Sequence, residues 1–189
     1  MTILICKTIL ASSIFFNPIW LDSHPNIKQE ARLVCEEVVE KSIDTGIDPV
    51  LVAALSYSES RFKRNLRSKA GAIGPMQVKV KWTCPNGERR GCDLVQAGIT
   101  HLKRLGLRYG CGEDSKKHAE ALLWKDGNKA FNAWADSQEL CLDPDWETVL
   151  CHYNSGTKCL NRGFPRLILS RYKKIRSLME KGRNVRDPE

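Results

Sequence analysis

The sequence lacks the patterns that would assign it to a common redox or nucleic-acid-binding class. Its cysteines never occur as C-x-x-C, so neither a zinc knuckle nor a thioredoxin-like site is expected. It contains no RNA-binding signature, no Cys/His finger spacing, no internal repeat and no low-complexity tract. We therefore expect no metal, no cofactor and no nucleic-acid partner.

The N-terminal segment, residues 1–22, lacks an apolar run long enough to cross a membrane, which takes about 20 mostly apolar residues. Its apolar patches are interrupted by Lys7, Asn17 and Pro18. Two interpretations stay open. The segment is either a secretory signal, with Ala11-Ser12-Ser13 as the small residues near a cut, or an N-terminal segment docked on the protein.

Size and composition indicate one globular domain with a basic surface. The chain has 189 residues, of which 42% are hydrophobic and 28% charged, and this length suits a single core. The formal net charge is +8, which favours an anionic partner, either nucleic acid or an anionic polymer of the cell wall. The simpler interpretation, favoured by the spread of basic residues along the chain, is a solvated basic face without a specific charge contact.

Eight cysteines indicate disulfides and an oxidising compartment, although buried free thiols remain the alternative. Eight cysteines allow about a hundred pairings, so the sequence does not determine the connectivity. We expect Cys84 to bond to Cys92, because a Pro-Asn-Gly turn fills the short stretch between them. Cys111, Cys141, Cys151 and Cys159 are expected to join a central insertion to the helix that carries Tyr153.

Hydrophobic periodicity predicts a mainly α fold with little or no sheet, because no alternating strand pattern is visible. Helices are expected over residues 26–41, 48–60, 93–109, 116–134 (interrupted around Gly127), from about 143 through Tyr153, and 164–179. Residues 64–76 contain Gly71, Gly74 and Pro75 and are expected to be irregular but ordered.

Glu59 is the first candidate for catalysis. It lies four residues after Leu55 and seven after Val52, so it shares their helix face. A carboxyl group on an apolar face near a helix end loses solvation, which disfavours its charged form and raises its pKa. Such a group stays protonated near neutral pH and can donate a proton to a leaving oxygen.

Three motifs follow in order along the chain: E-S-R-F at 59–62, S-K-A-G-A-I-G-P-M-Q at 68–77 and H-Y-N-S-G at 152–156. They resemble the motifs E-S-x-F, S-x-x-G-A-x-G-x-M-Q and A-Y-N-x-G of the soluble lytic transglycosylase family, and their spacing agrees as well. The resemblance covers about residues 48–110 and 145–178. It implies a goose-type lysozyme-like fold, with one catalytic domain over residues 23–182, an insertion near 111–144 and a tail over 183–189.

The resemblance also implies roles for single residues. Glu59 is the expected general acid and base, and peptidoglycan glycan strands are the expected substrate. Substrate binding is expected from the hydroxyl of Ser68, the amide of Gln77, the ring of Tyr153, and from Asn154 and Met76, with Met76 also weighed as a packing residue.

The expected reaction follows from the absence of a second catalytic carboxylate in the motifs. Most glycoside hydrolases use two carboxylates, and no second acid falls inside the motifs; Glu88, Asp93, Asp143 and Asp145 lie outside them. The resemblance implies that Glu59 protonates the oxygen between N-acetylmuramic acid and N-acetylglucosamine, and then takes the proton of the muramic 6-hydroxyl. Ring closure gives a 1,6-anhydro sugar. His152 is a further candidate acid, although on a helix it points away from Tyr153.

Two other functions stay open: a lysozyme-type hydrolase on the same fold, and a non-catalytic wall-binding or assembly protein. The intact Glu59, Ser68, Gln77 and Tyr153 argue against the second. The expected location is the periplasm, the extracellular space or a virion. We expect a monomer that opens the wall for phage entry or for a secretion or conjugation machine.

Overall fold

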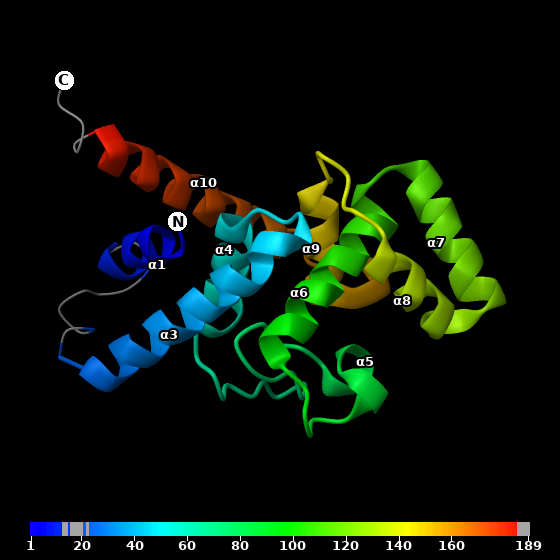
Figure 1. Cartoon of the computed structure of the whole chain (residues 1–189), viewed down its shortest axis with the longest axis horizontal. Helices are drawn as coiled ribbons and strands as arrows, with labels where there is room; N and C mark the ends of the chain where they lie inside the picture. Colours follow the sequence, from blue (N-terminus) through cyan, green and yellow to red (C-terminus); the bar gives the residue numbers. More distant parts are fainter. Residues whose placement is uncertain (13–14, 16–20, 22, 185–189) are drawn as a thin grey trace.

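Helix α4 (Pro49–Ser60) lies at the centre of the fold, and its sequence explains this position. All residues from 50 to 57 are buried, and a helix that is apolar all round has to lie inside a protein. In the computed structural model α4 is surrounded by α1 (Thr2–Ala11), α3 (Pro25–Ser42) and α10 (Gly163–Asn184) (Figure 1).

The structure describes residues 1–12, 15, 21 and 23–184. Asn17, Pro18 and the end of the expected C-terminal tail lie outside these residues. The remaining helices and helical turns run as follows: η1 (Ile43–Thr45), α5 (Val80–Thr83), η2 (Pro85–Gly87), α6 (Leu94–Leu105), η3 (Gly106–Gly110), α7 (Glu113–Lys125), α8 (Gly127–Ser137), α9 (Trp146–Ser155) and η4 (Gly156–Lys158).

The mainly α prediction is confirmed. Among the described residues, β pairing is limited to two isolated bridges, Arg67 with Ile73 and Ile73 with Val78. The start of α4 follows the expected pattern, because the Asp48 carboxylate accepts a hydrogen bond from the Val50 amide at 2.9 Å and Pro49 opens the first turn.

The helix expected over residues 93–109 is shorter than predicted. Helix α6 ends at Leu105, and a wider π turn, η3, follows. A Cβ on Gly106 would lie 2.6 Å from Leu140 Cδ1, and one on Gly110 would lie 2.6 Å from Val149 Cγ2. Close packing against these two side chains therefore sets the path of the turn, which helix periodicity alone does not reveal.

The expected insertion near residues 111–144 forms an antiparallel pair of helices, α7 and α8, at the opposite end of the molecule from α1 (Figure 1). It has a small apolar cluster of its own that includes Ala119, Phe131 and Ala135. Cys111 is bonded to Cys141, so this disulfide closes the insertion at its base. The expectation that these cysteines join the insertion to the helix of Tyr153 is wrong.

The other disulfides tie neighbouring elements. Cys84 is bonded to Cys92, the pair expected from the turn between them, and Cys151 to Cys159. Cys6 is bonded to Cys35, which joins α1 to α3. Ile5 and Ile9 of α1 are fully buried. None of the described helices is both long and apolar enough to span a membrane.

Candidate active site

Glu59 lies in the last turn of α4 and is partly exposed, whereas the preceding turns are buried. Burial raises the pKa of its carboxyl group to about 7. Among the described residues none donates a hydrogen bond to this carboxyl group, so loss of solvation alone accounts for the shift. At neutral pH the protonated and charged forms of Glu59 are therefore both populated.

The chain turns sharply directly after Glu59 and Ser60. Arg61 (φ 54°) and Phe62 (φ 61°) both adopt left-handed backbone conformations, which are unfavourable for residues with a Cβ. The Phe62 side chain is fully buried, and its ring centroid lies 5.9 Å from that of Tyr57. Burial of Phe62 in the core thus offsets the cost of a turn that ends α4 next to Glu59.

The loop of residues 68–77 is fastened to α4 beside Glu59. The hydroxyl groups of Ser60 and Ser56 donate hydrogen bonds to the Pro75 carbonyl at 2.9 and 3.2 Å. Both serines are buried, and their spacing of four residues places them on one side of α4. Gly74 has φ +79°, and a Cβ there would lie 2.6 Å from Leu94 Cδ1, so only glycine fits.

Ser68 and Gln77, two expected substrate-binding residues, are partly exposed and hold the loop in shape. The Ser68 hydroxyl accepts a hydrogen bond from the Ala72 amide at 3.0 Å, which leaves its own proton to donate. The Gln77 side-chain nitrogen donates to the carbonyls of Leu66 (3.1 Å) and Gly74 (3.0 Å). With both of its protons donated to these backbone carbonyls, Gln77 presents its amide oxygen, an acceptor, to a ligand.

Met76 differs from the expectation of substrate contact. Its side chain is 0% exposed, and it packs against α6, where a Cβ on Gly98 would lie 2.3 Å from Met76 Cβ. Met76 is therefore a core residue. Its backbone carbonyl joins the site instead, because it accepts a hydrogen bond from the Tyr153 hydroxyl at 2.8 Å.

Tyr153 brings α9 to the loop and to Glu59. Burial raises the pKa of its phenol well above the ordinary value, and the negative charge of Glu59 raises it further. The structure thus brings together Glu59, the loop of Ser68 and Gln77, and Tyr153.

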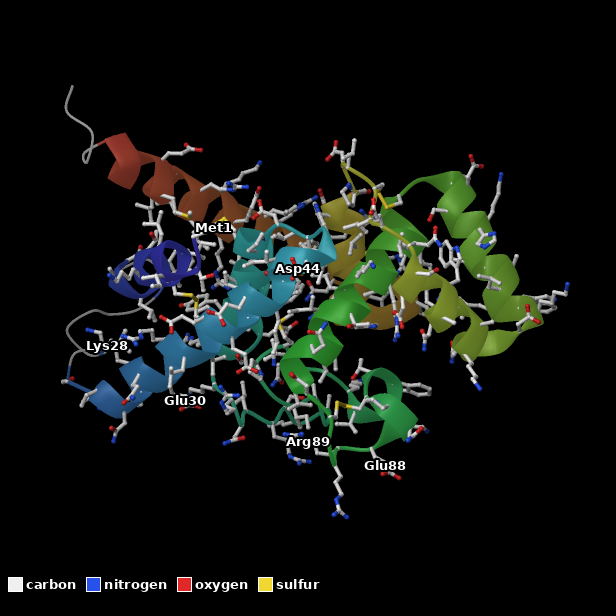
Figure 2. The ribbon with its side chains drawn as sticks, in the orientation of Figure 1. Met1, Lys28, Glu30, Asp44, Glu88 and Arg89 are labelled. Atoms are coloured by element: carbon white, nitrogen blue, oxygen red, sulfur yellow. A yellow bond between two sulfur atoms is a disulfide. The ribbon has the colours of Figure 1, made fainter. Side chains whose placement is uncertain are left out.

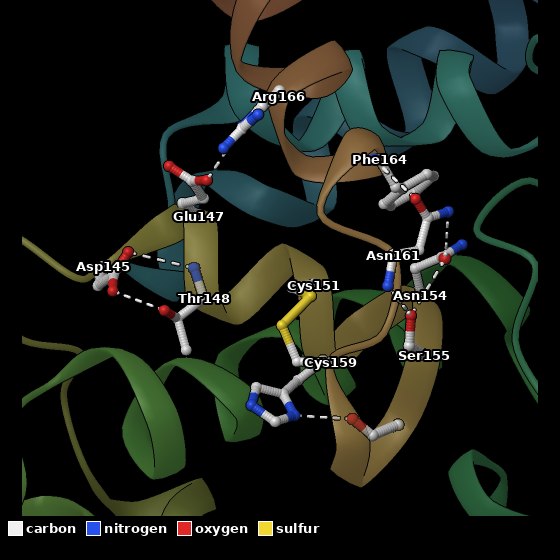
Figure 3. Close-up of a disulfide and its surroundings, with 12 residues drawn as sticks. Asp145, Glu147, Thr148, Cys151, Asn154, Ser155, Cys159, Asn161, Phe164 and Arg166 are labelled. Carbon is white, nitrogen blue, oxygen red and sulfur yellow. Dashed lines mark hydrogen bonds and ion pairs between the residues drawn. A yellow bond between two sulfur atoms is a disulfide. The ribbon is translucent and has the colours of Figure 1, made fainter.

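Asn154 follows on the exposed end of α9 (Figure 3). Its side-chain oxygen accepts a hydrogen bond from the Asn161 side-chain nitrogen at 3.2 Å, and the backbone amide of Asn161 donates to Ser155 Oγ. The disulfide Cys151–Cys159 holds the same turn from its other side. Asn154 is therefore fixed in place with its amide protons available to a ligand.

His101 belongs to this neighbourhood, although it lies outside all three sequence motifs. Its ring centroid lies 5.4 Å from that of Tyr153, and burial lowers its pKa to about 4, so it is neutral at pH 7. It stands three positions after Gly98 on α6, the helix face that meets Met76. The spacing from Gly98 indicates that His101 lies near the site, but only when the contact between α6 and Met76 is already known.

The other candidate acids either cap helices or are exposed on the surface. Asp93 caps α6 and pairs with Lys41, and Asp145 caps α9 through hydrogen bonds with Thr148 (Figure 3). Glu88 and Asp143 are exposed. None of the described carboxylates shifts the pKa of Glu59.

His152 points to another side of α9 than Tyr153. Its ring stacks on Tyr109 with centroids 3.7 Å apart, and its Nδ1 lies 2.7 Å from the Gly156 carbonyl. It lines a pocket of about 610 Å³ between η3, α7 and α9, and a second pocket of about 650 Å³ borders the Cys111–Cys141 disulfide. Glu59 lines neither pocket.

Metal binding has no support in the part of the chain that the structure describes, where no group of three His, Cys, Asp or Glu side chains is suitably placed. The site thus offers one carboxyl group that titrates near neutral pH, an amide oxygen, a hydroxyl and an aromatic ring. These groups suit proton transfer to a neutral, polar substrate such as a sugar chain.

Comparison with known protein families gives a match over much of the chain. Residues 38–166 match the family described as Transglycosylase SLT domain, a stretch that spans α4, the loop, α6, the insertion and α9. Neither the curated proteins nor the solved structures contain a match to the chain. Members of this family are generally transglycosylases that act on peptidoglycan. Since the match covers most of the chain, the protein belongs to the transglycosylase SLT domain family.

Proposed function

We propose that this protein is a peptidoglycan lytic transglycosylase in which Glu59 acts first as general acid and then as general base. The observation that carries the proposal is the position of Glu59, partly buried in the last turn of α4 beside the loop fastened by Ser60. This burial raises its pKa to about 7. A group with this pKa gives up a proton and takes one back near neutral pH at small cost.

The proposed reaction runs in two steps without water. Protonated Glu59 donates its proton to the oxygen that links N-acetylmuramic acid to N-acetylglucosamine, and the bond to the muramic C1 breaks. The muramic acetamido oxygen stabilises the positive charge at C1. The Glu59 carboxylate then removes the proton of the muramic 6-hydroxyl, whose oxygen bonds to C1 and forms the 1,6-anhydro ring.

The neighbouring groups have assigned tasks in this proposal. The Gln77 amide oxygen accepts from the N–H of the acetamido group, because both protons of its nitrogen are held by the loop. Ser68 and Asn154 donate to sugar oxygens. Tyr153 positions the loop through its bond to the Met76 carbonyl and offers its ring to the sugar.

The choice of ring closure over hydrolysis rests on the surroundings of Glu59. An inverting hydrolase needs a base carboxylate roughly 6.5–9.5 Å from the acid in order to seat a water, and a retaining one needs a carboxylate nucleophile at about 5–5.5 Å. A carboxylate at the nucleophile distance would raise the pKa of Glu59 by its negative charge, and no described carboxylate does so. The acetamido group of the substrate takes the place of the second carboxylate.

The test is mass spectrometry of the fragments that the protein releases from purified peptidoglycan. We expect fragments that borohydride does not reduce and that are lighter by one water than hydrolysed fragments. Reducible fragments would identify a lysozyme-type hydrolase instead, and no fragments at all would favour a non-catalytic wall-binding protein.

The residue assignment is tested with Glu59→Gln, which keeps the shape of the side chain but carries no acidic proton. We expect a loss of about 10²–10⁴ in rate, more if both steps depend on Glu59. Ser58→Ala serves as the control, because Ser58 lies next to Glu59 on α4 and bonds to Arg171. Activity of the folded Gln variant within about threefold of wild type, under 1 kcal/mol of barrier, would refute the assignment.

We further propose that the protein works as a monomer in an oxidising compartment, that is, in the periplasm, outside the cell or in a virion. The four disulfides support such a compartment. By analogy with small enzymes that pierce the wall, we also propose a role within a larger machine for phage entry, secretion or conjugation.

A further inference from the structure

The positive charge of the chain is concentrated beside the candidate active site. Residues 61–92, here called the basic segment, contain nine Lys and Arg and one acidic residue, Glu88. The remaining 21 basic and 21 acidic residues of the chain cancel. The formal net charge of +8 is thus equal to that of this one segment.

The charges of the basic segment face solvent. All nine basic residues are exposed, and of these only Arg64 has an acidic partner among the described residues, namely Glu37 at 2.8 Å. Arg89 and Glu88 lie at the edge of the molecule next to α5, far from Met1 (Figure 2). A surface of unpaired like charges raises the local concentration of anions and speeds their encounter with the protein.

Helix α10 gives a useful contrast. It carries seven basic residues and one acidic residue, but Arg166 pairs with Glu147, Arg176 pairs with Asp48, and Arg171 donates to Ser58. It also runs along the other side of the fold from the basic segment (Figure 1). Arg166, Arg171 and Arg176 thus help to hold the fold together, whereas in the basic segment only Arg64 has an acidic partner among the described residues.

The basic segment includes the loop of residues 68–77, which carries Ser68 and Gln77. Lys69 directly follows Ser68, and Lys79 comes two residues after Gln77. The two bridges place Arg67 and Val78 on either side of Ile73, so their backbones are about 10 Å apart at the usual spacing of paired strands. Arg67 and Lys79 therefore flank the loop that carries Ser68 and Gln77, and Lys69 lies within it.

A ligand for these charges has to be anionic and has to arrive with the sugar strand. The muramic sugar next to the scissile bond carries a short peptide, and this peptide bears carboxylates unless they are amidated. Guanidinium and ammonium groups form charge-assisted hydrogen bonds with carboxylates. We propose that the basic segment binds the free carboxylates of these peptides, so that the enzyme prefers strands with charged peptides over strands with amidated ones. The inference rests on the proposed transglycosylase function.

The test uses one peptidoglycan preparation divided in two, with the carboxylates of one half converted to amides by a carbodiimide and ammonia. We expect wild type to release 1,6-anhydro fragments from the charged half with a kcat/KM about 5- to 50-fold higher, since three exposed ion pairs each add a modest factor. This preference should shrink toward one as salt is raised to about 0.5 M. The salt series requires no variant, so it stands even if a variant fails to fold.

The variant Arg67→Gln/Lys69→Gln/Lys79→Gln should lower the preference for the charged half to within about twofold. The matched control is Lys173→Gln/Lys174→Gln on α10, two exposed lysines that should leave the preference unchanged. Equal release from both halves by wild type would overturn the inference and leave the proposed function intact. Absence of 1,6-anhydro fragments from both halves would instead overturn the proposed function.

A third preparation separates the carboxylates from phosphate groups of wall polymers. Hydrofluoric acid removes phosphate polymers and leaves the peptides on the strand. We expect wild type to keep its preference for charged peptides on the stripped wall. If activity falls on stripping and ignores amidation, the basic segment binds phosphate polymers and the inference is wrong.

Discussion

At the scale of single residues, the central feature is a carboxyl group with a mixed environment. Glu59 follows eight consecutive buried residues of α4, yet it is partly open to solvent. Full burial would hold it neutral at all relevant pH values, and full exposure would hold it charged. The intermediate position gives a pKa of about 7, which serves both halves of an acid and base cycle.

This pKa leads to a prediction for the pH dependence of the reaction. The free enzyme must carry a protonated Glu59, and a group whose pKa is raised to about 7 loses its proton as the pH rises through that value. We therefore expect kcat/KM to be highest below about pH 7 and to fall about tenfold per pH unit above it.

The measurement is the initial rate of release of soluble fragments from purified wall between about pH 5 and 9. Protein stability is followed in parallel by circular dichroism, so that unfolding is not mistaken for loss of a proton. A rate that stays constant or increases from pH 7 to 9 would show that Glu59 does not act in its protonated form.

At the scale of elements, the site depends on how closely α6 approaches the loop. Gly98 permits contact with Met76, and Met76 in turn accepts the bond from Tyr153. Three elements that are distant in sequence, α6, the loop and α9, thus meet around one residue. This meeting point supports the loop of Gln77, which Ser56 and Ser60 fasten to α4 beside Glu59.

The substitution Gly98→Ala tests this arrangement. The new Cβ would lie 2.3 Å from Met76 Cβ, a distance that forces the loop or α6 to shift. Overpacking of this kind costs about 1–3 kcal/mol, and a shift of the loop should also lower activity. Urea denaturation and fragment release are the two measurements.

Gly182→Ala is the matched control, because nothing lies within 4 Å of its added Cβ. The better helix propensity of alanine should leave this variant as stable as wild type or up to about 1 kcal/mol more stable. If Gly98→Ala behaves like Gly182→Ala in both measurements, α6 does not position the loop.

At the scale of the whole molecule, the four disulfides each close a short segment. They join residues 29, 8, 30 and 8 positions apart, so each ties a pair of neighbouring elements and none connects the ends of the fold. The molecule is a central helix with its neighbours, extended by the helices α7 and α8, which have their own apolar cluster and are closed at their base by the Cys111–Cys141 disulfide.

Reduction of the oxidised protein should therefore lower its stability strongly. Each disulfide contributes about 2–4 kcal/mol, and 1 kcal/mol corresponds to about 2–4 °C in a protein of this size. We expect a fall in Tm of roughly 20 °C or more with a phosphine reductant. An unchanged Tm, together with free thiols in the untreated protein, would mean that the cysteines are not bonded.

The sequence by itself determined the features that depend on neighbouring residues. The run from Asp48 to Leu55 contains both the cap and the apolar core of α4, and Glu59 follows in the same helical register. The Pro-Asn-Gly turn places Cys84 beside Cys92. These features are local, so hydrophobic periodicity and turn chemistry predict them.

The tertiary structure alone decided which faces meet. Met76 matched a substrate motif, but the approach of Gly98 makes it a core residue. His101 lies in the site because α6 packs against α9. Cys111 is bonded to Cys141 because α7 and α8 fold back on each other. The pKa of Glu59 likewise depends on how much solvent its packed neighbours exclude. Such contacts join residues far apart along the chain, so local sequence patterns do not predict them.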